Sequence, residues 1–306
     1  MLTRIAESLI ESSRRAVWQQ WQAVGAMVSG TPRAKAIVDP EALILLSLGL
    51  RDHERRLWDM LAWWAAVGAN LLSVQRMKNL AVKYPEPIHL RLTEFARLAH
   101  ETGGDFRWKS LAISSTGQIP RVERKRETDP QLLEPAALIL RIRMGIGVGI
   151  KADILSFLMG IGGAWASVKD ISVATYYSNR AIRRAADELV AARFMHSKAE
   201  TPTKYRVSPK PWTQLLQMKE PLPSWRYWHA VFAFVAHFLE YVEKEKFKEA
   251  SYLASTQARD LFEQHRSAFS WNKISVPDPK DFRGIEYLNG FHDTVLKLAE
   301  WLEESV

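Results

Sequence analysis

The chain has 306 residues, of which 47% are hydrophobic and 25% are charged, as is usual for a globular protein that buries ordinary cores. It has no cysteine, which excludes disulfides, thiolate catalysis and zinc sites with sulfur ligands and fits a cytoplasmic location. The net charge is +8, and the most apolar stretch, residues 136–168, is interrupted by Arg141, Arg143, Lys151 and Asp153. Charges inside a span are costly, so we expect no transmembrane helix and no membrane partner.

Residues 1–117 are predicted to form an N-terminal helical domain. Asp39 followed by Pro40 is typical of a helix start, with a capping side chain and a proline in the first turn. Apolar residues at helical spacing predict further helices near residues 54–67 and 88–100.

A short helix over residues 73–80, capped by Ser73, has two interpretations. It could be a second DNA-reading helix with four polar side chains turned outward: Gln75, Arg76, Lys78 and Asn79. Because no recognisable hairpin follows it, an ordinary solvated helix face is the favoured interpretation.

Residues 118–130 are predicted to be a charged linker, and residues 131–216 a central domain. After a proline-rich break, residues 217–306 are expected to form a C-terminal helical domain with helices near 225–248, 250–267 and 285–304. The aromatic residues of this last domain fit either a core or a dimer seam, which periodicity alone does not separate.

The central segment predicts three helices followed by a β-hairpin, so the fold class is mainly α with a central winged helix-turn-helix between helical flanks. The last two helices are expected over residues 168–174 and 179–192. A strand beginning at 194–195, a polar loop at 196–202 and a return strand at 203–207 complete the pattern; residues 195–207 are the predicted wing.

The positive charge is concentrated in this segment. Residues 141–212 hold twelve basic and five acidic residues, a net +7 in under a quarter of the chain, which is the electrostatic pattern of a nucleic-acid surface. Ser178 is a candidate cap whose helix start offers free amides to phosphate. The polar residues that follow can pair with base edges in the major groove: Asn179, Arg180, Arg183 and Arg184. Arg184 can instead pair with Glu188 one turn later.

Four stretches of this segment, residues 152–155, 166–171, 177–185 and 188–194, resemble bacterial winged-helix transcriptional regulators of the MarR/ArsR-like kind. The resemblance implies that the third helix reads the major groove of double-stranded DNA and that the hairpin contacts phosphates. Because one such helix covers only a few base pairs, a homodimer that reads a palindrome is also expected. The implied DNA-binding residues are Ser167, Lys169, Ser178, Asn179, Arg180, Arg183, Arg184, Lys198, Thr203, Lys204 and Arg206. The function expected is a sequence-specific transcriptional regulator, most simply a repressor.

The alternative is an interaction adaptor or antitoxin-like protein that binds a partner enzyme, encoded nearby, through its helical flanks. The stretch 140–149 resembles a group of longer winged-helix proteins, some of which lie beside nucleotidyltransferase-type genes. The two functions can coexist in one chain.

No enzyme, cofactor or metal is predicted. Residues 145–149 carry alternate glycines, but Ile150 breaks the dinucleotide-binding pattern and no glycine-lysine-serine/threonine motif is present. The histidines form no ligand motif, and His229 and His237 lie among aromatic residues that suggest packing. No nucleophile, base and orienting acid can be assembled from spacing.

Overall fold

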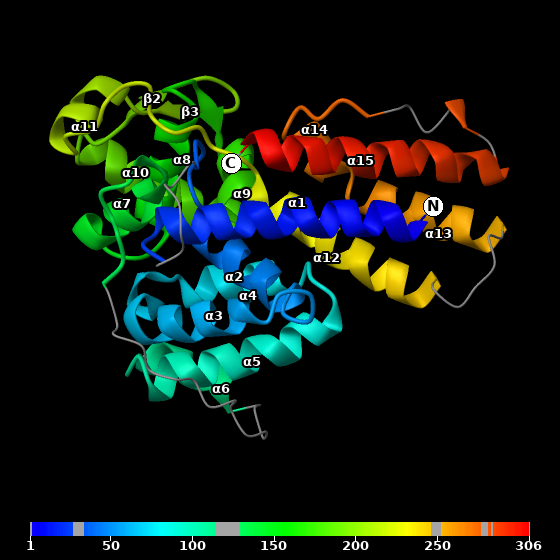
Figure 1. Cartoon of the computed structure of the whole chain (residues 1–306). Helices are drawn as coiled ribbons and strands as arrows, with labels where there is room; N and C mark the ends of the chain where they lie inside the picture. The colour runs from blue at the N-terminus through cyan, green and yellow to red at the C-terminus, as the bar shows by residue number, and fades with distance from the viewer. Residues whose placement is uncertain are drawn as a thin grey trace.

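The computed structural model describes residues 2–26, 34–113, 129–245, 252–276, 281–282 and 284–305, and it is mainly α-helical with one small sheet (Figure 1). The helices, in chain order, are α1 (Leu2–Ala23), α2 (Pro40–Gly49), α3 (Arg56–Val67), α4 (Val74–Ala81), α5 (Glu86–Glu101), α6 (Lys109–Ala112), α7 (Leu138–Ile146), α8 (Ile150–Gly160), α9 (Val168–Thr175), α10 (Asn179–Ala191), α11 (Pro209–Leu215), α12 (Trp228–Glu245), α13 (Tyr252–Gln264), α14 (Arg266–Ser270) and α15 (Tyr287–Ser305). Short 3-10 turns lie at Ala69–Leu71, Phe106–Trp108, Pro135–Ala137 and Gly284–Glu286.

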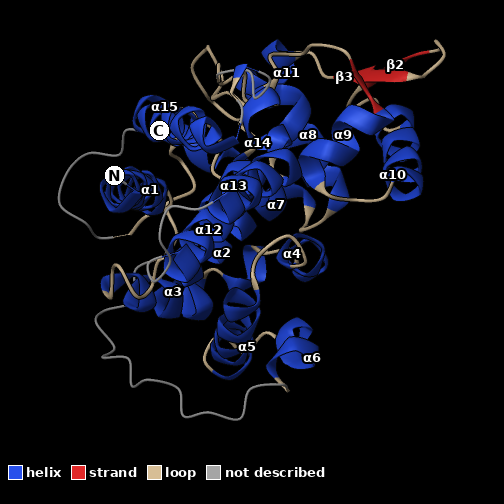
Figure 2. Ribbon diagram, turned by 90° about the vertical axis from the view of Figure 1, so that its right-hand side faces the viewer, coloured by secondary structure: helices blue, strands red, loops and turns tan. Residues whose placement is uncertain are grey.

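The two ends of the chain pack together. Helix α15 lies along α1, as both Figure 1 and Figure 2 show, and the Ser12 hydroxyl donates to Glu303 Oε1 at 3.0 Å. Helix α12 packs against α1 and α2, and its Trp228 indole donates to the Ile37 carbonyl at 3.0 Å. Phe232 and Phe238 are also fully enclosed. The C-terminal aromatic side chains therefore belong largely to the core of this chain.

The break between α7 and α8 follows from glycine. Gly147 and Gly149 have φ values of +105° and +143°, which side chains with a Cβ rarely adopt, and nothing occupies the space where a Cβ would stand. The predicted helix break is thus confirmed, but it covers residues 147–149, because α7 continues to Ile146.

Helices α8, α9 and α10 pack on one another, and a three-stranded antiparallel sheet covers one end of them. Strand β1 (Ala166–Ser167) lies between α8 and α9 in sequence, and β2 (His196–Lys198) and β3 (Lys204–Arg206) follow α10. The sheet order is β1-β3-β2, with Tyr205 opposite both Ala166 and Ser197. The buried side chains Ile171, Ile182 and Leu189 hold α9 and α10 to the core.

The hairpin differs from the predicted one at its first strand. Strand β2 begins at His196, inside the predicted loop, and not at residue 194. Arg193 turns the chain with φ +61° and Met195 is only 2% exposed, so residues 193–195 are used to leave α10 and anchor the hairpin. Strand β1 and helix α11 were not anticipated, because two and seven residues carry too little periodicity.

The predicted linker lies mostly outside the described residues, since the structure describes nothing between 113 and 129. Among the helices in the described ranges, none is long and apolar enough to cross a membrane.

Candidate nucleic-acid interface

The first turn of α10 is capped and electropositive. Ser178 accepts a hydrogen bond from the Ala181 amide at 3.3 Å, and the first turn holds no acidic residue. Ile182, Ala185 and Leu189 face the core, whereas Asn179 and Arg180 are exposed. The helix therefore presents free amides and polar donors at one exposed end, a favourable arrangement for phosphate and for base edges.

The three arginines of α10 are not equivalent. Arg180 and Arg183 are exposed, and neither forms an ion pair with any residue in the described part of the chain. Arg184 is also exposed, but its Nε lies 4.0 Å from Glu188 Oε1, and Glu188 also pairs with Lys151 at 2.6 Å. The predicted pairing of Arg184 with Glu188 is confirmed, which leaves Arg180 and Arg183 as the two uncompensated guanidinium groups.

The hairpin carries part of its own counter-charge. Glu200 accepts from both Lys198 and Lys204, the second at 3.2 Å, so that one carboxylate faces two ammonium groups. These two hydrogen bonds hold the pKa of Glu200 below its usual range. Thr203 is exposed between the strands. The predicted wing lysines are thus at the surface, but with their charge partly neutralised.

Arg206 lies over an aromatic ring that the sequence did not single out. Its guanidinium carbon is 4.7 Å from the centroid of Trp165, which precedes β1 and is 37% exposed. The sequence around Trp165 has no helical or strand periodicity that would have pointed to this residue. Only the pairing of β1 with β3 brings it to the hairpin.

Ser167 and Lys169 stand at the start of α9. Ser167 forms a capping box with Asp170: it accepts from the Asp170 amide at 3.2 Å and its hydroxyl donates to Asp170 Oδ2 at 2.8 Å. Lys169 is exposed beside this acidic residue. The Ser167 hydroxyl is therefore occupied, and Lys169 is the freer of the two candidates.

The sheet and α10 lie at one end of the molecule, with the hairpin above the helix in Figure 2. The Tyr205 hydroxyl donates to Asp187 Oδ1 at 3.4 Å and joins β3 to α10. Burial and the Asp187 carboxylate raise the pKa of the Tyr205 hydroxyl. The structure thus brings the helix candidates and the hairpin candidates to one end of the molecule.

Behind this end lies a buried ionic cluster that sequence reasoning missed. Arg76 and Arg143 are 0% and 1% exposed and are paired with three buried carboxylates, those of Asp39, Glu41 and Asp153. Burial opposes ionisation of Asp39 and Glu41, yet the adjacent guanidinium groups hold the pKa of both below the usual value. We call these five residues the buried ionic cluster.

The buried ionic cluster also decides the nature of α4. Ser73 caps this helix as predicted, accepting from the Arg76 amide at 3.2 Å. Arg76, however, is enclosed and not turned outward, because Asp39 and Glu41 lie on the side that it faces. The expected outward position is therefore wrong for Arg76, whereas Gln75 is exposed and Lys78 and Asn79 are half-buried.

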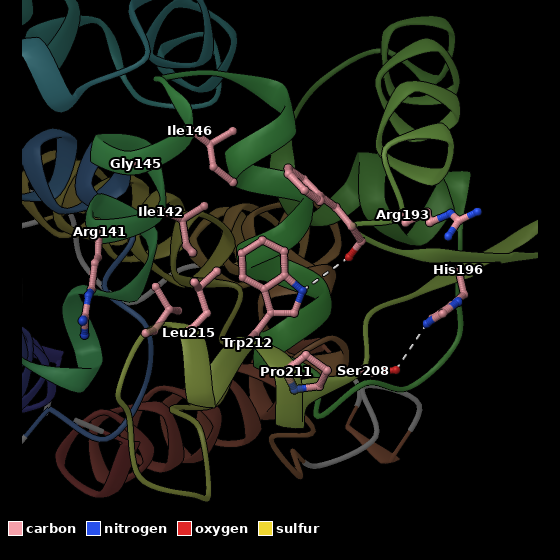
Figure 3. Close-up of a pocket in the computed structure, with 12 residues that line it drawn as sticks. Arg141, Ile142, Gly145, Ile146, Arg193, His196, Ser208, Pro211, Trp212 and Leu215 are labelled. Atoms are coloured by element: carbon pink, nitrogen blue, oxygen red, sulfur yellow. Dashed lines mark hydrogen bonds between the residues drawn. The ribbon is translucent and has the colours of Figure 1, made fainter.

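An apolar groove lies beside the interface, between the end of α7, the turn after α10 and α11 (Figure 3). Its volume is about 570 Å³, and its lining includes Ile142, Phe194, Trp212 and Leu215. The Trp212 indole donates to the Phe194 carbonyl at 3.3 Å. None of the predicted DNA-binding residues lines this groove.

The described residues contain no group of three or more histidine or acidic side chains placed to hold a metal ion. The chain matches no protein-family model, and no curated protein and no solved structure is matched to it.

Proposed function

We propose that this chain binds double-stranded DNA in a sequence-specific manner and regulates transcription, through a winged helix-turn-helix made of α8, α9, α10 and the sheet β1-β3-β2. The order helix, strand, helix, helix, strand, strand supports this proposal. So does the charge of the segment, with twelve basic and five acidic residues over 141–212.

The observation that carries the proposal is the state of Arg180 and Arg183. Both are exposed on a capped helix, and no carboxylate in the described ranges forms an ion pair with either. An arginine kept for structure is normally paired or packed, whereas an uncompensated pair beside free helix amides suits an anionic polymer.

In this proposal α10 lies in the major groove and the hairpin follows the adjacent backbone. Phosphate contacts supply most of the affinity and make it salt-dependent, and base contacts from Asn179, Arg180 and Arg183 supply discrimination. One such helix covers only a few base pairs, so a homodimer on a two-fold-symmetric site completes the proposal.

The test is a binding titration. Duplexes selected by the purified protein from a random-sequence pool are labelled and titrated with wild type and with Arg180→Ala/Arg183→Ala, at two salt concentrations. We expect the double variant to bind at least about 10-fold more weakly and with a shallower salt dependence, because it lacks two cationic donors.

Arg4→Ala/Lys297→Ala is the matched control. It removes the same charge from exposed positions on α1 and α15, away from α10 in Figure 1, and its affinity should stay near that of wild type. Equal affinity of the two double variants, or enrichment of no sequence from the pool, would refute sequence-specific binding through α10.

A second candidate function is an interaction adaptor, and the apolar groove favours it. Phe194 and Leu215 line this groove and are 45% and 72% exposed, so two large apolar side chains are in contact with solvent there. Exposed apolar surface of this kind often marks a site of protein interaction. Co-purification of a partner enzyme that is lost in Leu215→Glu, without any DNA binding by the wild type, would favour this function over the first.

A further inference from the structure

The turn between α9 and α10 is held from outside the helices that it joins. The Thr175 carbonyl accepts from Arg76 Nε at 3.0 Å, and the Tyr176 carbonyl accepts from Asn79 Nδ2 at 2.8 Å. The Tyr177 hydroxyl is hydrogen-bonded to Ser73 Oγ at 2.9 Å. Residues 175–177, the last residue of α9 and the first two of the turn, thus contact the short helix α4 or its cap.

Helix α4 is itself firmly anchored. Arg76 forms ion pairs of 2.6 Å with both Asp39 and Glu41, and its other terminal nitrogen donates to Asp39 at 2.7 Å. All three side chains are at most 2% exposed. Separating these groups would leave a buried charge without its partner. A shift of the helix would therefore cost a large amount of free energy.

The same turn is fixed on its second side by α8. The Tyr177 hydroxyl donates to Asp153 Oδ2 at 3.0 Å, and Asp153 in turn pairs with Arg143 at 2.8 Å. Tyr177 therefore connects the N-terminal helices to α8 directly before Ser178, the cap of α10.

We infer that α4 is a positioning element for α10: Ser73, Arg76 and Asn79 set where the helix begins and in which direction it leaves the molecule. The inference rests on the proposed function for its consequence, which is that DNA affinity depends on the N-terminal helices. Tyr176 has a left-handed backbone at φ +61°, a conformation that a non-glycine residue keeps only where its surroundings hold it.

Hydrogen exchange of the free protein tests the positioning directly. The informative amides are those of Tyr176, Ala181 and Ile182, which donate to Ser172 O, Ser178 Oγ and Ser178 O. Asn79→Ala/Tyr177→Phe removes two of the three contacts from α4 to the turn, and with them the hydrogen bond from Tyr177 to Asp153. It keeps the bond from Arg76 to Thr175 and the ion pairs of the buried ionic cluster. We expect these amides to exchange about 10-fold faster or more, because the turn opens more easily.

Lys78→Ala is the matched control on the same helix, since Lys78 donates to Ser110 and not to the turn. Its exchange at the three amides should equal that of wild type. Unchanged exchange in a folded Asn79→Ala/Tyr177→Phe protein overturns the inference.

The selected duplexes then separate the two proposals. We expect the Asn79→Ala/Tyr177→Phe variant to bind them about 5-fold to 10-fold more weakly than Lys78→Ala, because the start of α10 is no longer held in place. Faster exchange with undiminished DNA affinity overturns the dependence of affinity on α4. Failure of the wild type to bind any duplex overturns the proposed function and that dependence, while the exchange result still decides the positioning.

Discussion

Some arginines of this chain are buried in ion pairs and others are exposed without a partner in the described ranges. The neighbours of each side chain decide between these two environments. Arg143 is enclosed and donates to Glu41 at 2.6 Å and to Asp153 at 2.8 Å. Arg180 and Arg183 are exposed and lack such partners in the described ranges. In the first arrangement the charge is enclosed together with its partners, and in the second it stays unpaired at the surface.

Replacement of Arg143 by methionine should be strongly destabilising. The variant leaves Asp153 with one hydrogen bond, from Tyr177, and removes a counter-charge from Glu41, both of which are buried. Breaking a buried pair in this way costs about 3–5 kcal/mol. Urea denaturation measures the change. Arg15→Met, which removes exposed ion pairs with Glu11 and Glu303, should cost less than about 1 kcal/mol. Equal losses in both variants would contradict the importance of the buried ionic cluster.

His229 should make stability depend on pH. Burial, opposed by nearby Asp39, lowers the pKa of this imidazole from 6.5 to about 3, so the folded state keeps it neutral. The unfolded state binds a proton below pH 6.5, and stability therefore falls as the pH drops from 6.5 towards 3. Between pH 6.5 and pH 5 the loss from this group is about 2 kcal/mol.

Denaturation of wild type and His229→Phe at pH 7 and pH 5 measures this contribution. The variant should lose less stability on acidification, and His53→Gln, at an exposed position, should behave like wild type. Parallel pH profiles for wild type and His229→Phe would show that the histidine is accessible to protons in the folded state.

At the scale of elements, the hairpin and α10 lie on one surface, and side chains of the hairpin neutralise part of its positive charge. Glu200 pairs with Lys198 and Lys204, and Arg206 lies over Trp165. A hairpin that carries its own carboxylate binds phosphate less strongly than its number of lysines suggests. Its lysines must either separate from the carboxylate or bind phosphate while the carboxylate stays close by.

On the proposed function, Glu200→Gln should strengthen DNA binding. Both lysines then become free for phosphate, so we expect about a 3-fold to 10-fold gain in affinity at low salt and a salt slope that is steeper by about one. The control Glu240→Gln makes the same charge change on α12, where Glu240 pairs with Lys244, and should leave affinity unchanged. A gain of equal size in both would indicate a general charge effect and no hairpin contact.

At the scale of the whole molecule, the buried ionic cluster joins the N-terminal helices to the central segment. Asp39, Glu41 and Arg76 come from the first part of the chain, and Arg143 and Asp153 from the central part. The Val38 amide also donates to the Ala136 carbonyl at 2.9 Å. A division at residues 117 and 131 would therefore separate ion pairs that are fully enclosed.

The isolated fragment 131–216 should not fold cooperatively. It would expose Arg143 without Glu41 and would lose the Ser73 and Asn79 contacts that hold the turn before α10. Circular dichroism should show little helix and no sharp thermal transition, in contrast to the full chain. A cooperative transition within a few degrees of that of the full chain would support an independent winged-helix domain with the boundaries expected from sequence.

The sequence was most informative where structure depends on near neighbours. The caps at Asp39, Ser73 and Ser178 need only a side chain and an amide three residues on, and all three are confirmed. The glycine break before α8 and the exposed face of α10 follow from the same local rules. The start of β2 was misplaced by two residues, because the turn at Arg193 depends on packing of Met195 and not on hairpin chemistry.

The amino-acid sequence by itself determined a mainly helical chain, several of its helix starts and the basic character of residues 141–212, because propensity, capping and charge act over a few residues. Only the tertiary structure decided that Arg76 and Arg143 are buried while Arg180 and Arg183 are exposed. It also decided that α4 holds the turn before α10. The reason is physical: whether a guanidinium group is buried depends on carboxylates that lie close in space and are up to 102 residues away along the chain, as for Arg143 and Glu41.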